Sequence, residues 1–383
     1  MNHLFRDTAL VGTLASTGYC VVAIWAAIRF ARTRATPTPS SPDLPPLSIL
    51  KPLKGTDPQM YEALRSHCLQ NYPQYEILFG ISDPHDPAIT VVEQLRREFP
   101  DHAIQLVPCE RVLGANGKVS SLAQLAAVAK YDCLLVNDSD IRVEREYLRA
   151  VVSELQQADV GLVTCLYRGI SSATMGSKFE SLGISTDFAV GVLVAREIEG
   201  GLRFGLGSTL ALRRSDLEAI GGFEVIADYL ADDYELGQRI TKKNLKVVLA
   251  HAIVDSFLPA YGFSEFFSHQ LRWARTIRAS RPGGYAGLLL TFTLPWALLN
   301  LVLTRGAEWA VTLFGVALLI RIVMASTVGK LVLNDREIFR SLWLLPIRDL
   351  LALVLWMGGL AGGKIVWRGE TFHLRDGKLQ RAR

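Results

Sequence analysis

Two aspartates, Asp138 and Asp140, come directly after a short apolar run in the segment LLVNDSDIRV (134–143). Carboxylates at the end of a buried strand are unfavourable unless they are paired or bound to a cation. Oxygen ligands at this spacing suit Mg²⁺ or Mn²⁺ held together with the phosphates of a substrate. A cation there would neutralise charge that builds on a departing nucleoside diphosphate. The same spacing is also typical of an Asx turn, so the motif alone leaves both interpretations open.

Three further carboxylates stand at the ends of expected elements. Asp83 follows the apolar run YEILFGIS (75–82), where it either accepts hydrogen bonds from a base or ribose or closes a turn. Asp232 and Asp233 open a helical segment that continues as ELGQRITKKN (235–244). One interpretation is helix capping with favourable charge at the helix N-terminus. The other is a general base that takes a proton from an attacking hydroxyl group.

The segment HQLRWAR (269–275) combines aromatic and basic side chains, and Arg278 and Arg281 follow it. Basic residues three positions apart lie along one face of a helix. Such a face either holds anionic lipid headgroups or contributes to a catalytic site. In the second interpretation Arg272 binds pyrophosphate, because a planar guanidinium suits phosphate, and Trp273 walls an acceptor site. The two interpretations are compatible.

Glycine and lysine add weaker signals. The stretch Gly205-Leu206-Gly207-Ser208 precedes an expected strand, and Gly221-Gly222-Phe223 follows a short expected helix. Glycine lets the backbone approach a ligand closely, but turns use it equally often. Lys118 in GANGKVSS (114–121) either reaches a phosphate or is a surface lysine at the start of a helix.

Strands and helices alternate in the part of the chain that carries these residues. Apolar runs of strand length and helical patterns occur, in chain order, at 47–52, 60–69, 75–82, 88–98, 103–108, 118–129 and 131–137. This alternation predicts an α/β domain with a mostly parallel sheet and right-handed crossovers. In such sheets ligands bind at the carboxyl ends of the strands, which is where Asp83 and Asp138 stand.

An uncharged run at 8–28 is long enough to cross a bilayer as one helix. The positive charges lie behind it, at Arg29, Arg32 and Arg34, and no cleavage site follows, so we expect a permanent anchor with the next segment in the cytosol. Residues 35–46 (ATPTPSSPDLPP) are rich in Pro, Ser and Thr and predict a linker.

Three more hydrophobic runs lie near the C-terminus, at 282–304, 309–329 and 341–363. If all three crossed the membrane, the basic C-terminal tail would lie outside, against the positive-inside rule. We therefore expect one run, the last, to be interfacial or re-entrant, because Arg348 and Asp349 near its start are unfavourable in hydrocarbon.

Composition supports a membrane protein and excludes other classes. Half of the 383 residues are hydrophobic, and the net charge of +4 is too small, with no basic stripe, for a nucleic-acid binder. The five cysteines are scattered without metal-ligand spacing, so neither a zinc site nor a disulfide framework is expected. No internal repeat is evident.

The motifs together, in this order, resemble the ceramide glucosyltransferase family. This family is a branch of the inverting family-two glycosyltransferases with the GT-A fold, and the chain is most similar to its hopanoid-biosynthesis-associated members. The resemblance is carried by SILKPLKGTDP (48–58), YPQYEILFGISDPHDPAI (72–89), KYDCLLVNDSDIRV (130–143), ADDYELG (231–237) and the Arg-Trp pair at 272–273.

This resemblance implies a role for each motif residue. Asp138 and Asp140 would bind Mg²⁺ or Mn²⁺ and the diphosphate, and Asp233, with Asp232 the weaker candidate, would be the catalytic base. The donor would be bound by the residues Lys51, Asp83, Lys118, Asp138 and Arg272. The acceptor would be bound by the residues Gly207, His269 and Trp273. His269 departs from the family pattern, which has Gln or Arg at that position.

We therefore expect an anchor and linker at 1–43, a cytoplasmic GT-A domain at 44–280, and membrane helices with a basic tail at 281–383. The expected reaction moves a hexosyl unit from UDP-GlcNAc or UDP-glucose to a lipid hydroxyl at a bacterial inner membrane. A hopanoid polyol such as bacteriohopanetetrol is the first expected acceptor and ceramide the alternative. Other possibilities are a processive polysaccharide synthase, which needs a transmembrane channel, and a non-catalytic lipid-binding scaffold.

Overall fold

The computed structural model describes residues 2–34, 44–367 and 369–381. Most of the expected linker, residues 35–43, lies outside the described residues, as does the end of the basic tail. The chain forms two compact units, each described by itself below. We call residues 36–170, 199–259 and 377–383 the sheet unit, and residues 1–35, 171–198 and 260–376 the helical unit.

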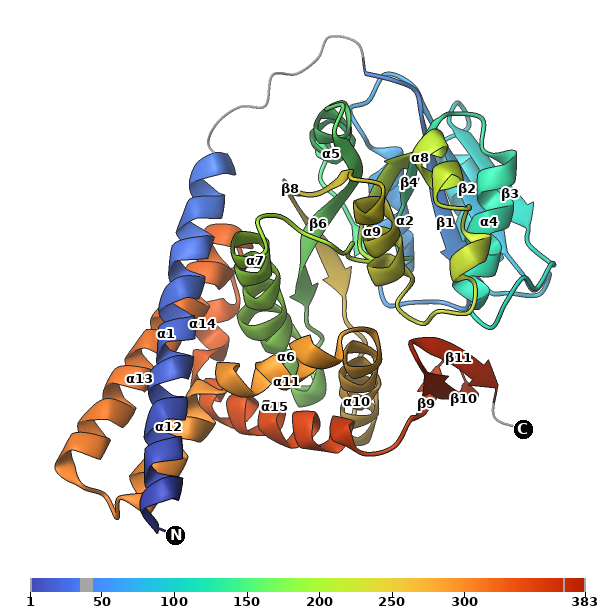
Figure 1. The fold of residues 1–383 in the computed structure, drawn as a ribbon. Coiled ribbons are helices and arrows are strands. Elements are labelled where there is room, and N and C mark those ends of the chain that lie inside the picture. Colours follow the sequence, from blue (N-terminus) through green and yellow to red (C-terminus); the bar gives the residue numbers. More distant parts are fainter. Residues whose placement is uncertain (1, 35–43, 368, 382–383) are drawn as a thin grey trace. The chain divides into compact units, whose positions relative to one another are not determined.

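The sheet unit alternates strands and helices along most of its length (Figure 1). Its strands are β1 (Leu47–Leu53), β2 (Tyr75–Ile81), β3 (Ala103–Pro108), β4 (Cys133–Val136), β5 (Ile141–Arg142), β6 (Val160–Ile170), β7 (Leu210–Arg213), β8 (Lys246–Phe257) and β11 (Lys378–Arg381). Its helices are α2 (Met60–Cys68), α3 (Ala88–Glu98), α4 (Gly117–Val128), α5 (Tyr147–Leu155), α8 (Arg214–Ala219), η2 (Glu224–Ile226) and α9 (Asp232–Lys242).

Eight of these strands form one mixed sheet in the order β3-β2-β1-β4-β7-β6-β8-β5. Strands β3, β2, β1 and β4 are parallel neighbours, and β6 is parallel to β8. β7 runs antiparallel between β4 and β6, and β5 pairs antiparallel with the edge of β8. The predicted mostly parallel α/β fold is confirmed. The expected helices and strands between 47 and 137 all occur, with ends within two residues of the prediction.

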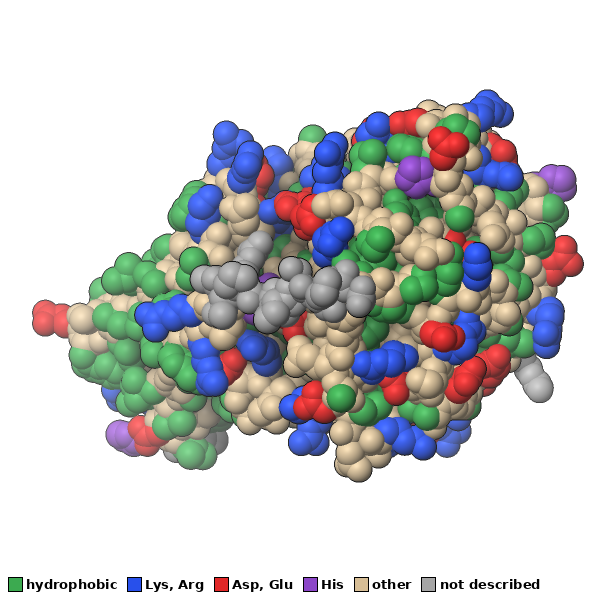
Figure 2. Space-filling model, turned by 90° about the horizontal axis from the view of Figure 1, so that it is seen from above, with side chains coloured by type: hydrophobic (Ala, Val, Ile, Leu, Met, Phe, Trp, Pro, Cys, Tyr) green, Lys and Arg blue, Asp and Glu red, His purple; other side chains and the backbone are tan. Residues whose placement is uncertain are grey.

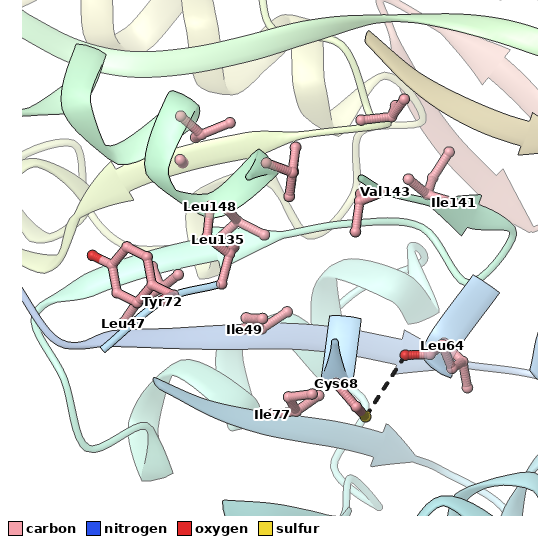
Figure 3. Close-up of a cluster of buried hydrophobic side chains, with 14 of the residues drawn as sticks. Leu47, Ile49, Leu64, Cys68, Tyr72, Ile77, Leu135, Ile141, Val143 and Leu148 are labelled. Atoms are coloured by element: carbon pink, nitrogen blue, oxygen red, sulfur yellow. Dashed lines mark hydrogen bonds between the residues drawn. The ribbon is translucent and has the colours of Figure 1, made fainter. Parts of the chain in front are cut away.

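The core of the sheet unit explains why these runs form strands. Leu47, Ile49, Ile77 and Leu135 are fully buried on β1, β2 and β4, and the side chains of α2 and α5 pack with them (Figure 3). Strands covered on both faces read as continuous apolar runs, which is the pattern seen in the sequence. This packed core holds the carboxyl ends of β1, β2 and β4 in fixed register, Leu50 beside Val136 and Leu53 beside Ile81.

The helical unit contains the hydrophobic runs and two helical segments that the sequence placed in the catalytic domain. Its helices are α1 (Asn2–Arg34), α6 (Met175–Gly183), η1 (Ile184–Phe188), α7 (Ala189–Ile198), α10 (Phe263–Ser280), α11 (Pro282–Gly287), η3 (Leu288–Thr291), α12 (Thr293–Leu303), α13 (Glu308–Ser326), η4 (Thr327–Val332), α14 (Ile338–Ser341), η5 (Leu342–Leu344) and α15 (Leu345–Leu360). Strands β9 (Lys364–Trp367) and β10 (Glu370–Arg375) pair antiparallel, so much of the expected basic tail is folded.

Within the described residues, two helical stretches are long and apolar enough to cross a bilayer, His3–Thr33 and Glu308–Val332. A third candidate, Pro282–Thr291 with Thr293–Leu303, is bent by 55° and is either a broken span or a re-entrant loop. The break thus falls in the second hydrophobic run. The last run forms α15, whose 16 residues are fewer than the roughly 20 that a span requires, so its interfacial placement stays a prediction.

Helix α1 packs against α12, α13 and α7. The approach to α12 is close, because a Cβ added at Gly12 would lie 2.4 Å from the ring of Trp296. Large hydrophobic side chains remain exposed along α1 and α13, and Figure 2 shows such side chains gathered on one face of the helical unit. An exposed apolar surface of this extent suits a lipid environment.

The charges within the hydrophobic runs are paired with each other. Arg321 of α13 forms a bidentate pair with Asp349 of α15, at 2.9 and 2.6 Å, and also contacts Asp187 of η1 at 2.7 Å. Arg348 lies 3.2 Å from Asp187. The charges of α15 are therefore compensated, which removes the isolated-charge argument for placing that run at the interface.

Candidate functional site

The acidic residues named from the sequence stand at the carboxyl ends of parallel strands in the sheet unit. Asp138 and Asp140 follow β4, and Asp83 follows β2, with β1 between these two strands. Asp232 and Asp233 are the first two residues of α9. The expectation that Asp232 and Asp233 open a helix is confirmed.

Lys118 brings three of these segments together. Its Nζ lies 2.8 Å from Asp138 Oδ1 and 3.2 Å from Asp232 Oδ2, and its side chain is only 18% exposed. The interpretation of Lys118 as a surface lysine is therefore wrong. The side chain of Asp138 is 39% exposed, so the cluster opens to solvent on the side of that carboxylate.

Helix α4 holds Lys118 in place through its N-terminus. Asn116 caps the helix by accepting a hydrogen bond from Val119 N, and its own side chain donates to Tyr229 O at 2.7 Å. Gly114 is required here, since a Cβ at this position would lie 2.5 Å from Ala227 O. The loop before α4 is thus fastened to the loop that leads into α9, and Lys118 starts from a fixed backbone.

Gly207 lies between the carboxylates. Its N–H donates to Asp233 Oδ2 at 2.8 Å, and a Cβ there would meet Asp138 Oδ2 at 3.1 Å and Asp233 Oδ2 at 3.5 Å. A side chain would therefore occupy the space that the two carboxylates face. The other glycine pair, Gly221 and Gly222, has φ of 95° and 75° and forms a turn.

The crowded charges shift the pKa values of the cluster. Burial, and then the Asp232 carboxylate, raise the pKa of Asp233 to about 6. Burial also raises the pKa of Asp232, although Lys118 opposes this. Burial alone would lower the pKa of Lys118, but the carboxylates of Asp138, Asp232 and Asp233 outweigh it and raise that pKa. A carboxyl group with a pKa close to neutrality is suited to general base catalysis.

Asp140 is held from β8, because Ser256 Oγ donates to its Oδ2 and Phe257 N donates to its backbone oxygen at 3.2 Å. Burial, and then the carboxylate of Asp138, raise the pKa of Asp140 to about 6. Two carboxylates that repel each other beside an open edge fit a divalent cation. Within the described residues no group of three or more His, Cys, Asp or Glu side chains is arranged to hold one. Two oxygen ligands of this kind suit a divalent cation whose remaining ligands come from substrate phosphates.

Lys51, assigned to the donor from the sequence, lies behind the site. It is fully buried on β1, and its Nζ donates to the backbone oxygen of Asp138 at 3.0 Å. Burial lowers the pKa of Lys51 to about 7, although Asp138 and Asp140 oppose this. In this structure Lys51 supports the loop that carries the two aspartates.

Sequence reasoning missed a buried network around Asn137. Its side chain donates to Tyr147 Oη at 2.8 Å and to Ser208 O at 2.6 Å, and it lies 3.1 Å from His67 Nε2. Ser139 donates to the Asp57 carboxylate on the other side of the loop. The only signal in the sequence was an amide placed directly before the Asp138 motif.

No hydrogen bond or ion pair within the described part of the chain joins Asp83 to the carboxylates around Lys118. It is exposed, and its Oδ1 accepts a hydrogen bond from His85 N at 2.9 Å, which is an Asx turn. The topology nevertheless places it at the same edge of the sheet as Asp138.

The remaining motif residues belong to α10 of the helical unit. His269 Nδ1 lies 3.2 Å from Glu180 Oε2. The ring of Trp273 packs beside those of His269 and Phe188, with ring centroids 5.5 and 6.1 Å apart. Thr276 donates to the backbone oxygen of Arg272. The aromatic part of the motif is therefore packed against α6 and η1.

The basic face of α10 is only partly available for a ligand. Arg275 donates to Lys364 O at 2.6 Å, and Arg278 donates to the backbone oxygens of Leu360 and Gly362. These two arginines hold the chain that leaves α15. They are therefore engaged within the protein, which weakens the headgroup interpretation for both.

Comparison with known proteins identifies the fold. The structure is similar to a mannosyltransferase from Pyrobaculum calidifontis in complex with GDP-Man and Mn²⁺, with a TM-score of 0.54 and 18% identity over 93% of this chain and 97% of that chain. At this identity the similarity concerns the fold alone, and it confirms the expected GT-A fold.

Two curated relatives are ceramide glucosyltransferases. Ceramide glucosyltransferase 1 of Caenorhabditis elegans is 25% identical over 353 residues, covering 88% of this chain and 73% of the relative. The enzyme of Candida albicans is 34% identical over 121 residues, covering 28% of this chain and 22% of the relative. The resemblance noted in the sequence is thereby confirmed. Because the model of glycosyl transferase family 21 matches residues 8–380, nearly the entire chain, the protein belongs to that family and is a glycosyltransferase.

Proposed function

We propose that the protein transfers a hexosyl unit from a nucleotide sugar to a hydroxyl group of a membrane lipid, in one inverting step. The observation that carries this proposal is the group of carboxylates around Lys118, with Asp138 partly open to solvent and Gly207 leaving space beside it. Such a group offers a cation site and a base at one edge of a sheet, as the reaction requires.

The donor would lie over the carboxyl edge of β1, β2 and β4. Asp138 and Asp140 would hold Mg²⁺ or Mn²⁺, which when bound supplies positive charge against the leaving diphosphate. The ammonium group of Lys118 would add a positive charge beside the diphosphate. Arg272 is proposed to bind the pyrophosphate. Asp83 would bind the base or ribose. That assignment requires its Oδ1 to exchange the hydrogen bond from His85 N for one from the ligand.

Asp233 is the proposed general base. The lipid hydroxyl oxygen attacks the anomeric carbon while the bond from that carbon to the diphosphate oxygen breaks. The hydroxyl proton passes to Asp233, and the nucleoside diphosphate leaves with the bonding electron pair. Asp233 is preferred to Asp232, because Asp232 is paired with Lys118, whereas the hydrogen bonds that Asp233 accepts from described residues come from the backbone N–H groups of Gly207 and Tyr234. A raised pKa near 6 leaves it ionised at neutral pH and still basic.

A lipid acceptor is supported by the helical unit and by the relatives. Its candidate spans keep the chain in a bilayer, so the acceptor need never leave the membrane. Relatives with 25% identity over most of this chain are named ceramide glucosyltransferases, which favours a hydroxyl group on a lipid and UDP-glucose among the donors. UDP-GlcNAc as donor and a hopanoid polyol as acceptor are proposed from the sequence resemblance. The arginines after the anchor favour a cytoplasmic catalytic part, proposed as 44–280, at a bacterial inner membrane.

The test is a transfer assay with the purified full chain. Labelled UDP-glucose and UDP-GlcNAc are supplied with vesicles that contain ceramide, a hopanoid polyol or neither, with Mg²⁺, Mn²⁺ or chelator. Mass spectrometry of the lipid products identifies sugar and acceptor. We expect one monoglycosylated lipid with inverted anomeric configuration, dependent on the cation. A polymeric product, or no lipid product with any donor, would refute the proposal.

A further inference from the structure

The C-terminal strand β11 pairs with the loop that leads into α9. We call this loop, residues 227–231, the base loop, because the proposed general base follows it. Leu379 N donates to Asp228 O at 2.7 Å, and a second hydrogen bond of 3.2 Å runs from Leu230 N to Gly377 O. All of these residues belong to the sheet unit. The last residues of a chain are usually poorly ordered unless they are tied down, and these two hydrogen bonds tie them to the base loop.

Side chains around Tyr229 reinforce this pairing. Tyr229 stands opposite Lys378 in an antiparallel bridge, and Lys378 Nζ lies over the Tyr229 ring, 5.2 Å from its centroid. The guanidinium of Arg239 on α9 lies 5.7 Å from the same centroid. Leu379, the next residue of β11, is only 4% exposed, so the strand is packed into the protein. The tyrosine ring thus connects the C-terminal strand to the helix that carries the proposed base.

The base loop is also fastened to the loop before α4. Asn116 N donates to Ala227 O at 2.7 Å, and Ala115 N donates to Asp228 Oδ1 at 2.9 Å. Lys118 follows two residues after Asn116. The base loop is therefore joined both to the end of the chain and to the segment that carries the central lysine of the site.

Helix α9 depends on its neighbours for the position of its first turn. Ala231 is the N-cap, and no side chain caps the helix there. Gly205 N holds the backbone oxygen of Asp233 at 3.1 Å, and the base loop determines the direction from which the chain enters the helix. A general base must lie within hydrogen-bond reach of the proton that it takes, so the placement of this turn matters for catalysis.

We propose that residues 377–379 are a positioning clamp for the general base, which hold the base loop and through it the first turn of α9 with Asp233. The inference rests on the proposed function and adds a role for the last strand of the chain. The clamp touches neither the cation site nor the strand before it. Its loss should therefore lower kcat and leave donor binding unchanged.

A reversible cross-link tests the clamp. Tyr229 and Lys378 form a non-hydrogen-bonded antiparallel pair, in which Cα atoms lie about 4.5 Å apart, a separation that a disulfide can span. The double variant Tyr229→Cys/Lys378→Cys is reduced with dithiothreitol or oxidised with diamide, and it is desalted before the transfer assay. The five natural cysteines are all buried. Reduced, the variant should lose kcat about tenfold with its donor affinity unchanged, and oxidised it should return to within about threefold of the natural chain.

A matched control and thermal unfolding separate this role from a purely structural one. Lys243→Cys places a single thiol at the exposed end of α9 and should match the natural chain in both redox states. A natural kcat in the reduced double variant would overturn the clamp, and so would a loss that the formed disulfide does not restore. A weaker donor affinity together with a lower Tm would also overturn it, since the bridge would then only stabilise the sheet unit.

Hydrogen exchange measured by mass spectrometry checks the same contact without any substrate. We expect residues 227–236 to exchange faster in the reduced double variant than in the natural chain, and to return on oxidation. Equal exchange in all three samples would overturn the clamp while leaving the proposed function intact. Absence of any lipid product with the natural chain would refute the proposed function, and with it the base that the clamp serves.

Discussion

Both units contain a cation surrounded by carboxylates, but the two clusters are built differently. Around Arg321 in the helical unit, the guanidinium donates to both oxygens of Asp349, to Asp187 and to Thr186 O. The side chains of Arg321 and Asp349 are 5% and 3% exposed. Around Lys118 in the sheet unit, the partner carboxylate of Asp138 is 39% exposed.

The difference lies in how replaceable the partners are. A guanidinium with fixed planar geometry, bonded on all sides, forms a closed structural contact that no ligand can enter without breaking it. An ammonium is a point charge that can exchange one partner for another. The single positive charge of Lys118 contacts the two carboxylates of Asp138 and Asp232 and therefore does not neutralise both of them. We infer that the Arg321 cluster stabilises the fold, and that the charged groups around Lys118 remain able to bind a charged ligand.

The largest expected effect concerns the proposed base. Asp233→Asn removes the proton acceptor but keeps the shape, and its single amide oxygen can accept from only one of the two backbone donors, Gly207 N and Tyr234 N. We expect kcat to fall about 10²- to 10⁴-fold, with donor binding nearly unchanged. Turnover is measured in the lipid assay and donor affinity by calorimetry. Asp132→Asn, which changes an exposed carboxylate of the same unit, is the control. Full activity in Asp233→Asn would remove this residue from the mechanism.

Removing the basic side chain at the centre of each cluster tests whether the two clusters differ in this way. Arg321→Met leaves Asp349 buried and unpaired, and we expect a loss of about 3–5 kcal/mol in the free energy of unfolding. Lys118→Met leaves Asp138 in contact with water but Asp232, whose side chain is 10% exposed, without its cation, so we expect a smaller loss of stability than in Arg321→Met together with loss of transfer activity. Unfolding of both variants in the same detergent gives the two values. Equal destabilisation would contradict the distinction between a closed and an open cluster.

Asp140 tests the cation site. Asp140→Ala removes one of two proposed ligands, and we expect the metal-dependent part of donor binding to weaken by roughly 10- to 100-fold. Titration of donor binding with Mn²⁺ and with Mg²⁺ measures this. Glu144→Gln, an exposed carboxylate four residues further on, should leave the titration as it is in the natural chain. An unchanged titration in Asp140→Ala would argue against the assignment.

The smallest expected effect is the pH dependence. The pKa of Asp233 is raised to about 6, and a base must be ionised to accept a proton, so kcat/KM should be level above pH 7 and fall below pH 6. At pH 5 it should be roughly a tenth of its value at pH 8. A profile between pH 5 and pH 8 at saturating cation is the measurement. A flat profile would show that proton transfer to Asp233 does not limit the reaction.

The sequence by itself determined where the elements begin and end and which of them carry acidic residues. The run before Asp138 became β4, and α9 begins at Asp232, because burial periodicity and helix-start chemistry are local properties. The long apolar helix that covers 8–28 could be predicted in the same way, because an uncharged run of that length suits a single membrane-spanning helix. These features needed no knowledge of distant contacts.

Tertiary structure alone decided which side chains meet. Lys118 pairs with Asp138 and Asp232, which lie 20 and 114 residues further along the chain, and Glu180 meets His269 across 89 residues. Asp349 was expected to be an unfavourable charge in an apolar run, but the fold brings it within hydrogen-bond distance of Arg321, 28 residues before it. A side chain's partner, exposure and pKa depend on which elements pack beside it, and that is set by the summed burial of the entire core rather than by neighbouring residues.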